Sequence, residues 1–278
     1  QAHWSHIRRS RERLMNIDLN GRTALVSGST QGIGLAIATQ LARSGARVVV
    51  NGRSQSTVDK AEEHLVDTIP GARIIGVAAD LATAEGVERL TERVPVVDIL
   101  VNNLGIFGSA PALEIDDDEW RRYFEVNVLS AIRLIRTYLP GMIENGWGRI
   151  QNICSDSAVV IPEEMIHYGM TKTALLAVTR GFAKAAARTG VTVNSVIVGP
   201  THTGGVEDFV AELVGDDLPW DEAQAKFMKE NRPQSLIGRL IEPEEVGNMI
   251  VYLSSDQASA TTGGALRVDG GYVDSILP

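Results

Sequence analysis

The sequence predicts a single α/β domain built on a doubly wound parallel sheet of about seven strands. Short apolar segments alternate with segments of helical periodicity from residue 23 to the C-terminal region. Most apolar segments are hydrophobic throughout rather than at every second residue, as expected of parallel strands covered on both faces. Alternation of this kind, with right-handed crossovers, places helices on both faces of one sheet.

The predicted strands are short apolar runs bounded by turn residues. In chain order they are residues 23–28, 46–52, 72–80, 97–103, 148–154, 190–198 and 263–268. The segments between them repeat apolar residues at helical spacing. The first predicted helix, residues 34–45, ends at Gly45, because glycine commonly closes helices. The others are residues 56–69, residues 84–94, one long helix over 120–143 and the helix that contains Tyr168.

Residues 15–278 are predicted to form one domain, without an internal repeat or a linker rich in proline or serine. An insertion of about residues 204–232 interrupts the alternation and mixes apolar and charged residues at helical spacing. We expect it to cover the substrate site as a mobile lid. Residues 1–14 are rich in Arg and His, and three interpretations stay open: a processed leader, a remnant of an expression sequence, or a native basic arm.

Composition excludes several classes of protein. With 278 residues, 44% of them hydrophobic, the chain can bury one substantial core. The net charge of -9 argues against a nucleic-acid-binding surface. No apolar run reaches the roughly 18 to 20 residues of a membrane span, and no signal-peptide pattern is present. Cys154 is the single cysteine, which rules out an intrachain disulfide. We therefore expect a cytoplasmic protein.

A glycine-rich turn separates the first predicted strand from the first helix. Gly28, Gly32 and Gly34 form the pattern G-x-x-x-G-x-G. Glycines here allow a tight turn and bring backbone N–H groups against a pyrophosphate, whose charge is favoured at a helix N-terminus. Its place after the first strand predicts a dinucleotide-binding (Rossmann) sheet. The alternative is a turn that serves only close helix packing.

The end of the second strand indicates which dinucleotide is bound. An acidic residue there accepts from the ribose 2′-hydroxyl of NAD, whereas an arginine suits the 2′-phosphate of NADP. Gly52 stands at the likely acidic position and Arg53 follows it, which favours NADP, with NAD possible. An ordinary exposed arginine is the alternative. Asp80, at the end of the third strand, either bonds the adenine or caps the next helix.

Three polar residues predict acid/base chemistry. Ser155 ends the fifth strand, Tyr168 follows thirteen residues later, and Lys172 stands one helical turn beyond Tyr168. Reduction of a carbonyl by hydride needs a proton donor at the developing alkoxide, and the reverse reaction needs a base. A phenol with its usual pKa is a poor base, but a nearby ammonium lowers that pKa. A serine hydroxyl can hold the substrate oxygen beside the phenol.

Taken together, these motifs resemble the short-chain dehydrogenase/reductase superfamily, in its single-domain branch that includes 3-oxoacyl-carrier-protein reductases. The resemblance covers residues 19–273. The matching pieces are SGSTQGIG from Ser27, ADL around Asp80, NNLG from Asn102, VNV around Asn127, Ser155, YGMTK from Tyr168, and TGGALRVDGG from Thr262.

The resemblance implies a role for each matching residue. Tyr168 would be the general acid/base, and Lys172 would lower its pKa and bind the nicotinamide ribose. Ser155 would polarise the carbonyl, and Asn127 would hold a helix kink and a water of a proton relay. Besides Tyr168 and Lys172, the implied cofactor-binding residues are Gly28, Ser29, Gln31, Gly32, Ile33, Gly34, Arg53, Asp80, Leu81, Asn103 at the adenosine ribose, and Thr201 and Thr203 near the carboxamide.

The resemblance also implies a small alcohol or ketone substrate and a homotetramer or homodimer. The departures are Ser27 for threonine, Gln31 at an often basic position, Leu104 for a small residue that lies near the cofactor ribose, and Val198 for proline. None of them removes a catalytic group. The stretch after Met142 lacks the basic cluster that docking of an acidic carrier protein would need, which disfavours a 3-oxoacyl-carrier-protein reductase.

Other functions have less support. Cys154 is better explained as a small buried residue than as a nucleophile activated by His167. His167 and His202 lack the neighbouring carboxylates of a metal site, so we expect no metal. Ile161, Met165 and Glu163 are expected to line the substrate wall between Ser155 and Tyr168. The competing hypothesis from another class is a non-catalytic NADP-binding sensor, which would not need Ser155, Tyr168 and Lys172.

Overall fold

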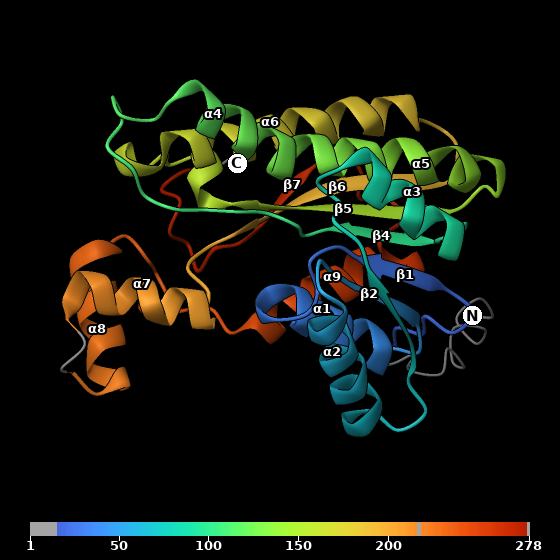
Figure 1. Cartoon of the computed structure of the whole chain (residues 1–278), viewed down its shortest axis with the longest axis horizontal. Coiled ribbons are helices and arrows are strands. Elements are labelled where there is room, and N and C mark those ends of the chain that lie inside the picture. Colours follow the sequence, from blue (N-terminus) through green and yellow to red (C-terminus); the bar gives the residue numbers. More distant parts are fainter. Residues whose placement is uncertain (1–15, 216–217, 277–278) are drawn as a thin grey trace, which may run out of the picture.

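The computed structural model describes residues 16–215 and 218–276 and contains the predicted doubly wound sheet. Its seven strands lie in the order β3-β2-β1-β4-β5-β6-β7 (Figure 1). Every neighbouring pair is parallel. The strands are β1 Thr23–Val26, β2 Arg47–Gly52, β3 Arg73–Ala78, β4 Ile99–Asn102, β5 Gly148–Ser155, β6 Val191–Val198 and β7 Ala265–Val268. The predicted fold class is confirmed, and most predicted strands were a few residues too long.

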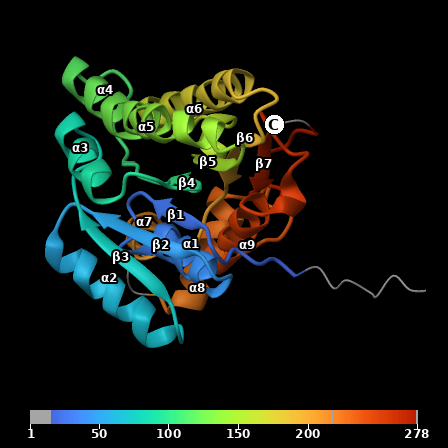
Figure 2. The ribbon, with the colours of Figure 1, turned by 90° about the vertical axis from the view of Figure 1, so that its right-hand side faces the viewer.

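Helices cover both faces of this sheet, as the two views show (Figures 1 and 2). On one face pack α1 (Gly32–Arg43), α2 (Gln55–Thr68) and α9 (Pro243–Leu253). On the other lie α3 (Ala84–Arg93), α5 (Ser130–Glu144) and α6 (Ile166–Ala185).

Successive residues of one strand serve the two cores in turn. In β1, Val26 packs with the α1 side and Leu25 with the α5 side; both are fully buried. The central strands therefore need apolar residues at every position, which explains their unbroken hydrophobic runs.

The long helix predicted over 120–143 is three segments. Helix α4 (Asp117–Phe124) begins after Asp116, whose side chain accepts from the N–H of Glu119 at 2.8 Å. A π-helical turn, Glu125–Leu129, joins α4 to α5. Periodicity predicted one long helix and did not show this local insertion, which contains Asn127, where the family resemblance implies a helix kink.

Two further helices form the predicted insertion. Helices α7 (Gly204–Val214) and α8 (Trp220–Asn231) stand beside the main body (Figure 1). They share a small core of Val210, Val214, Ala223, Phe227, Met228 and Leu240. Since α7 begins soon after β6 ends, this pair stands at the carboxyl edge of the sheet. No helix within the described residues is long and apolar enough to cross a membrane.

Candidate active site

The carboxyl ends of the parallel strands bring the predicted site residues to one edge of the sheet, where ligands bind in doubly wound folds. The glycine turn follows β1, Asn103 follows β4, Ser155 ends β5, and Thr201 follows β6. Thr203 lies near the glycine turn, because a Cβ added to Gly32 would be 3.5 Å from its Cγ2. Segments far apart in sequence thus meet around one site.

Positive φ angles and close packing both favour glycine in the turn after β1. Gly28 and Gly32 have φ of 60° and 55°, the left-handed region that favours glycine. A Cβ on Gly34 would lie 2.4 Å from the carbonyl oxygen of Gly28. A bound pyrophosphate could therefore approach the backbone N–H groups at the start of α1. The residues present fit a dinucleotide.

Hydrogen bonds from the neighbouring strands hold this turn. The Asn103 amide donates to the carbonyl oxygens of Ser27 and Gly28 at 3.1 and 2.9 Å. Ser27 Oγ accepts from the backbone N–H groups of Asn103 and Leu104, both at 3.0 Å. The departure at Ser27 therefore keeps the hydroxyl that the turn needs. Asn103 therefore supports the turn directly, and its contact with the ribose stays a prediction.

Sequence reasoning missed Asn51, which also holds the turn. Its Oδ1 accepts from the Gly28 N–H at 3.2 Å, and its Nδ2 donates to the carbonyls of Val77 and Ala79. The Asn51 N–H donates to Ser29 Oγ, so the buried Ser29 hydroxyl is used within the protein. The signal was a polar residue within the apolar run VVVNG.

Arg53 lies exposed at the end of β2, close to two hydroxyl residues. A Cβ on Gly52 would come 2.6 Å from the Thr30 methyl group and 3.4 Å from its hydroxyl. Ser54 is the N-cap of α2. Asp80 is not the N-cap of α3, because Thr83 is. The Asp80 side chain instead accepts from the Ala82 N–H at 3.1 Å.

Ser155, Tyr168 and Lys172 lie together at the end of β5. Lys172 Nζ is 5.6 Å from the centroid of the Tyr168 ring and donates to the Ile153 carbonyl at 3.0 Å. Ser155 Oγ donates to Asp156 Oδ1 at 2.9 Å and accepts from the Ser157 N–H at 3.1 Å. The Ser155 hydroxyl also lowers the pKa of the Tyr168 phenol. A serine has one proton, and here it goes to Asp156 Oδ1.

Within the chain itself, burial has the largest effect on the pKa of the Tyr168 phenol. Burial raises the pKa of the Tyr168 phenol, and the Ser155 hydroxyl only partly opposes this. Burial also lowers the pKa of Lys172. The Lys172 ammonium is engaged by a carbonyl rather than by the phenol, so the chain by itself does not lower the phenol's pKa.

Asn127 lies in the π-helical turn and links two loops of the site. Its Oδ1 accepts from the Ile106 N–H at 2.8 Å, and its Nδ2 donates to the Ile106 carbonyl and to Thr171 Oγ1. A Cβ on Gly105 would be 3.3 Å from Lys172 Nζ and 3.5 Å from Asn127 Oδ1. Asn127 and Lys172 therefore flank the same glycine.

Apolar side chains form the mouth of the site. The ring of Phe107, which sequence reasoning missed, lies edge-on to Tyr168 at 6.2 Å and is 55% exposed. A Cβ on Gly205 would touch Phe107 Cζ at 3.5 Å, so this ring connects Tyr168 with α7. Ile161 lies against Gly169, whereas Met165 is buried and Glu163 exposed.

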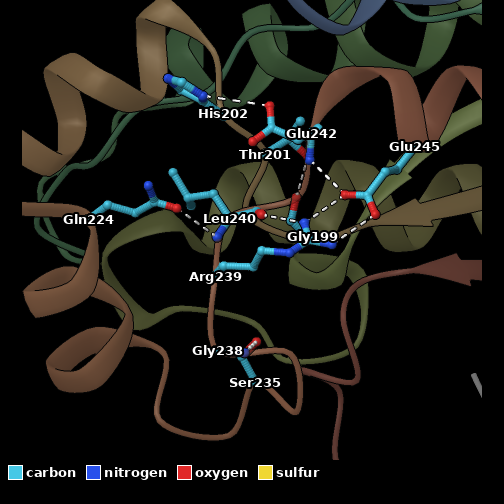
Figure 3. Close-up of polar contacts among 10 residues, drawn as sticks. All are labelled: Gly199, Thr201, His202, Gln224, Ser235, Gly238, Arg239, Leu240, Glu242 and Glu245. Carbon is cyan, nitrogen blue, oxygen red and sulfur yellow. Dashed lines mark hydrogen bonds and ion pairs between the residues drawn. The ribbon is translucent and has the colours of Figure 1, made fainter. Parts of the chain in front are cut away.

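Polar contacts fix the base of the α7–α8 pair (Figure 3). His202 Nε2 lies 2.7 Å from Glu207 Oε1, and its ring stacks on Trp220. Arg239 binds both carboxylate oxygens of Glu245 at 2.8 and 3.0 Å. The side chain of Glu245 also accepts from the Glu242 N–H, which completes a capping box at α9.

Thr201 and Thr203, the two residues predicted near the carboxamide, both lie in the loop that follows β6. Thr203 Oγ1 caps α7 by accepting from the Val206 N–H at 3.3 Å. Thr201 Oγ1 donates to the Gly199 carbonyl at 2.9 Å. Both hydroxyls are thus used within the protein. Among residues 16–215 and 218–276, no three His, Cys, Asp or Glu side chains gather as metal ligands, and burial raises the pKa of the Cys154 thiol.

Comparisons with known proteins agree with this arrangement. A family model described as Enoyl-(Acyl carrier protein) reductase matches residues 28–273. The uncharacterized oxidoreductase YvaG of Bacillus subtilis is 49% identical over 264 residues, 95% of this chain and 100% of the relative. D-beta-hydroxybutyrate dehydrogenase of Cupriavidus necator is 35% identical, covering 92% of this chain and 99% of that one.

A solved structure is similar over almost the whole chain. L-sorbose reductase from Gluconobacter frateurii, complexed with NADPH and L-sorbose, superposes with a TM-score of 0.88 at 33% identity, covering 94% of this chain and 100% of that one. The chain belongs to the short-chain dehydrogenase/reductase family of oxidoreductases.

Proposed function

We propose that this protein is an NADP(H)-dependent oxidoreductase that interconverts a secondary alcohol and a ketone. The observation that carries the proposal is the convergence of Ser155, Tyr168 and Lys172 beside the glycine turn at one edge of the sheet. A purely sensory protein would need the turn but no acid/base group. Names of relatives, among them dehydrogenases and a sorbose reductase with NADPH, support the same reaction class.

The side chains would divide the work as follows. A bound nicotinamide would supply or accept the hydride. Tyr168 donates its phenolic proton to the carbonyl oxygen during reduction, and its phenolate takes the proton from the alcohol during oxidation. Ser155 donates to the same oxygen, which requires its proton to turn away from Asp156 Oδ1. With the dinucleotide bound, the Lys172 cation, 5.6 Å from the centre of the Tyr168 ring, would stabilise the phenolate.

Coenzyme preference is expected to depend on Arg53. Because the guanidinium would pair with the 2′-phosphate, Arg53→Ala should weaken NADPH binding by about 10- to 100-fold and leave NADH binding almost unchanged. Titration of each reduced coenzyme by nicotinamide fluorescence measures the ratio. Arg47→Ala, which removes an exposed arginine from the opposite end of β2, is the control. A wild-type preference for NADH would contradict the assignment.

The α7–α8 pair is proposed to act as the lid of the site. Its link to Tyr168 through Phe107 and its polar base at Arg239 support this. Arg239→Gln removes the bidentate contact with Glu245, so the KM of the ketone should rise several-fold and proteolysis between α7 and α8 should accelerate. Arg89→Gln, an exposed arginine of α3, is the control. If KM and the rate of proteolysis are both unchanged in Arg239→Gln, the Arg239–Glu245 contact does not support the proposed lid.

By the same family resemblance we propose a homodimer or homotetramer that works in the cytoplasm. Strand β7 ends the sheet and pairs with β6 alone, so its other edge could meet a second copy. Light scattering in solution would give the mass directly, and a monomer would contradict the proposed assembly.

A further inference from the structure

Arg232 directly follows the lid helix α8, and backbone contacts fix its position. Pro233 follows it, and a residue before proline disfavours helical backbone, so α8 ends at Asn231. The Arg232 N–H donates to the Met228 carbonyl at 3.1 Å, and its own carbonyl accepts from the Ser235 N–H at 3.0 Å. The side chain therefore starts from a fixed backbone.

Aromatic rings hold the guanidinium of Arg232 on two sides. Its Cζ lies 5.4 Å from the ring centroid of Phe227, in the small core of the lid, and 5.5 Å from that of Tyr272, which follows β7. Such cation–ring contacts are favourable and restrict the plane of the guanidinium. Nη1 donates to the Asn231 carbonyl at 2.7 Å. The hydrogen bond thus uses Nη1 and leaves the Nε–Nη2 edge of the guanidinium without a partner from this set.

The remaining edge of Arg232 consists of Nε and Nη2. Nε is buried, and neither atom has a hydrogen-bond acceptor among residues 16–215 and 218–276. Buried N–H donors are normally satisfied, so an unsatisfied one requires an explanation. The Nε–Nη2 edge presents parallel N–H groups, the geometry that binds a carboxylate through both oxygens. A ligand that supplies a carboxylate would satisfy this edge.

The Arg232 cation interacts electrostatically with Asp156, which follows Ser155 at the carboxyl end of β5. Burial raises the pKa of Asp156, the carboxyl group beside Ser155, and the Arg232 cation acts against that rise. Yet no oxygen of Asp156 comes within the 4.0 Å of an ion pair with Arg232. Asp156 Oδ1 accepts instead from Ser155 Oγ at 2.9 Å. Asp156 is therefore near Arg232 but does not fill its free edge.

We propose that Arg232 binds a carboxylate of the substrate through Nε and Nη2, so that the protein acts on an oxo acid and the corresponding hydroxy acid. This inference rests on the proposed function. The carboxylate would lie at the Arg232 edge while the reacting oxygen lies at Ser155 and Tyr168. In a chain with a net charge of -9, an anionic substrate needs such a local cation.

Matched substrate pairs test this assignment. Oxidation of NADPH is followed with acetoacetate and methyl acetoacetate, with pyruvate and methyl pyruvate, and with 5-oxogluconate and L-sorbose. Within at least one pair the wild type should favour the acid. Arg232→Gln should raise the KM of that acid by about 10- to 100-fold, because hydrogen bonds to a charged group are lost. The KM of the uncharged partner and the kcat for both should change little.

Two further variants separate recognition from packing. Arg232→Lys keeps the charge but loses the paired donors, so the preference for the acid should fall to an intermediate value. Lys229→Gln removes an exposed charge of the same sign one turn earlier in α8 and should change nothing. If Arg232 has only a structural role, its substitution should impair activity with the acid and with the ester equally, and that result overturns the inference. Where Arg232→Gln folds poorly, Arg232→Lys alone gives the same comparison.

The outcomes also separate this inference from the proposed function. If the wild type reduces esters or neutral sugars but favours no acid, the carboxylate assignment to Arg232 is wrong and the oxidoreductase stands. If the wild type oxidises NADPH with none of the ketones tested, the proposed function itself is wrong.

Discussion

Tyr168→Phe is expected to lower kcat for ketone reduction by about 10²- to 10⁴-fold, the usual contribution of a positioned general acid or base. The variant removes the only phenolic proton that lies beside Ser155 in the described chain. The Tyr168 ring contacts Phe107 and lies 5.6 Å from Lys172 Nζ, and phenylalanine keeps both contacts. NADPH binding, followed by fluorescence, should therefore persist.

The direction of the pH dependence follows from the same site. Burial raises the pKa of Tyr168, so alcohol oxidation by the wild type, which needs the phenolate, should accelerate as pH rises. The residual activity of Tyr168→Phe should lose this dependence. Tyr252→Phe, in α9 and remote from the strand ends, should behave like the wild type. Full turnover by Tyr168→Phe would show that another group supplies the proton.

Gly34→Ala is expected to abolish coenzyme binding and to lower the free energy of unfolding by about 1–3 kcal/mol, as overpacking does. The added Cβ would lie 2.4 Å from the Gly28 carbonyl oxygen, which is backbone and cannot rotate away. It would also meet Asn103 Nδ2 at 2.5 Å, the group that donates to that same carbonyl. The turn must open, and its N–H groups then leave the pyrophosphate position.

A matched glycine separates this clash from the general effect of substituting glycine in a helix. Gly181, exposed within α6, has nothing within 4 Å of an added Cβ. Gly181→Ala should therefore stabilise the protein by up to about 1 kcal/mol, because alanine is the better helix former. Chemical denaturation and coenzyme titration of both variants measure the contrast. Normal coenzyme affinity in Gly34→Ala would contradict the assigned role of the turn.

The parallel sheet could be predicted because its evidence is local in sequence. Val48, Val49 and Val50 alternate between the two cores, so an unbroken apolar run was the correct signature of β2. Periodicity alone could not predict the π-helical turn, because it accompanies contacts of Asn127 with Ile106 and Thr171, 21 and 44 residues away. Helix α9 was missed although its capping box, Glu242 and Glu245, could have indicated its start.

The candidate site divides in a similar way. Residue types and spacing predicted Ser155, Tyr168 and Lys172, since their chemistry depends on what the side chains are. Residue types and spacing could not predict that Asp156 accepts a hydrogen bond from Ser155 or that Lys172 donates to the Ile153 carbonyl. Both contacts depend on the side-chain positions in the folded protein. Arg232 gave no signal at all, since its free edge is defined only by Asn231, Phe227 and Tyr272.

The most direct test of the oxidoreductase assignment follows NADPH absorbance with a panel of ketones, for the wild type and Tyr168→Phe side by side, with coenzyme binding measured for both. We predict that the wild type oxidises NADPH with at least one ketone, and that Tyr168→Phe binds NADPH but loses nearly all of this activity. A wild-type protein that binds NADPH tightly and turns over no ketone, and no alcohol with NADP, would contradict the assignment and indicate a sensor.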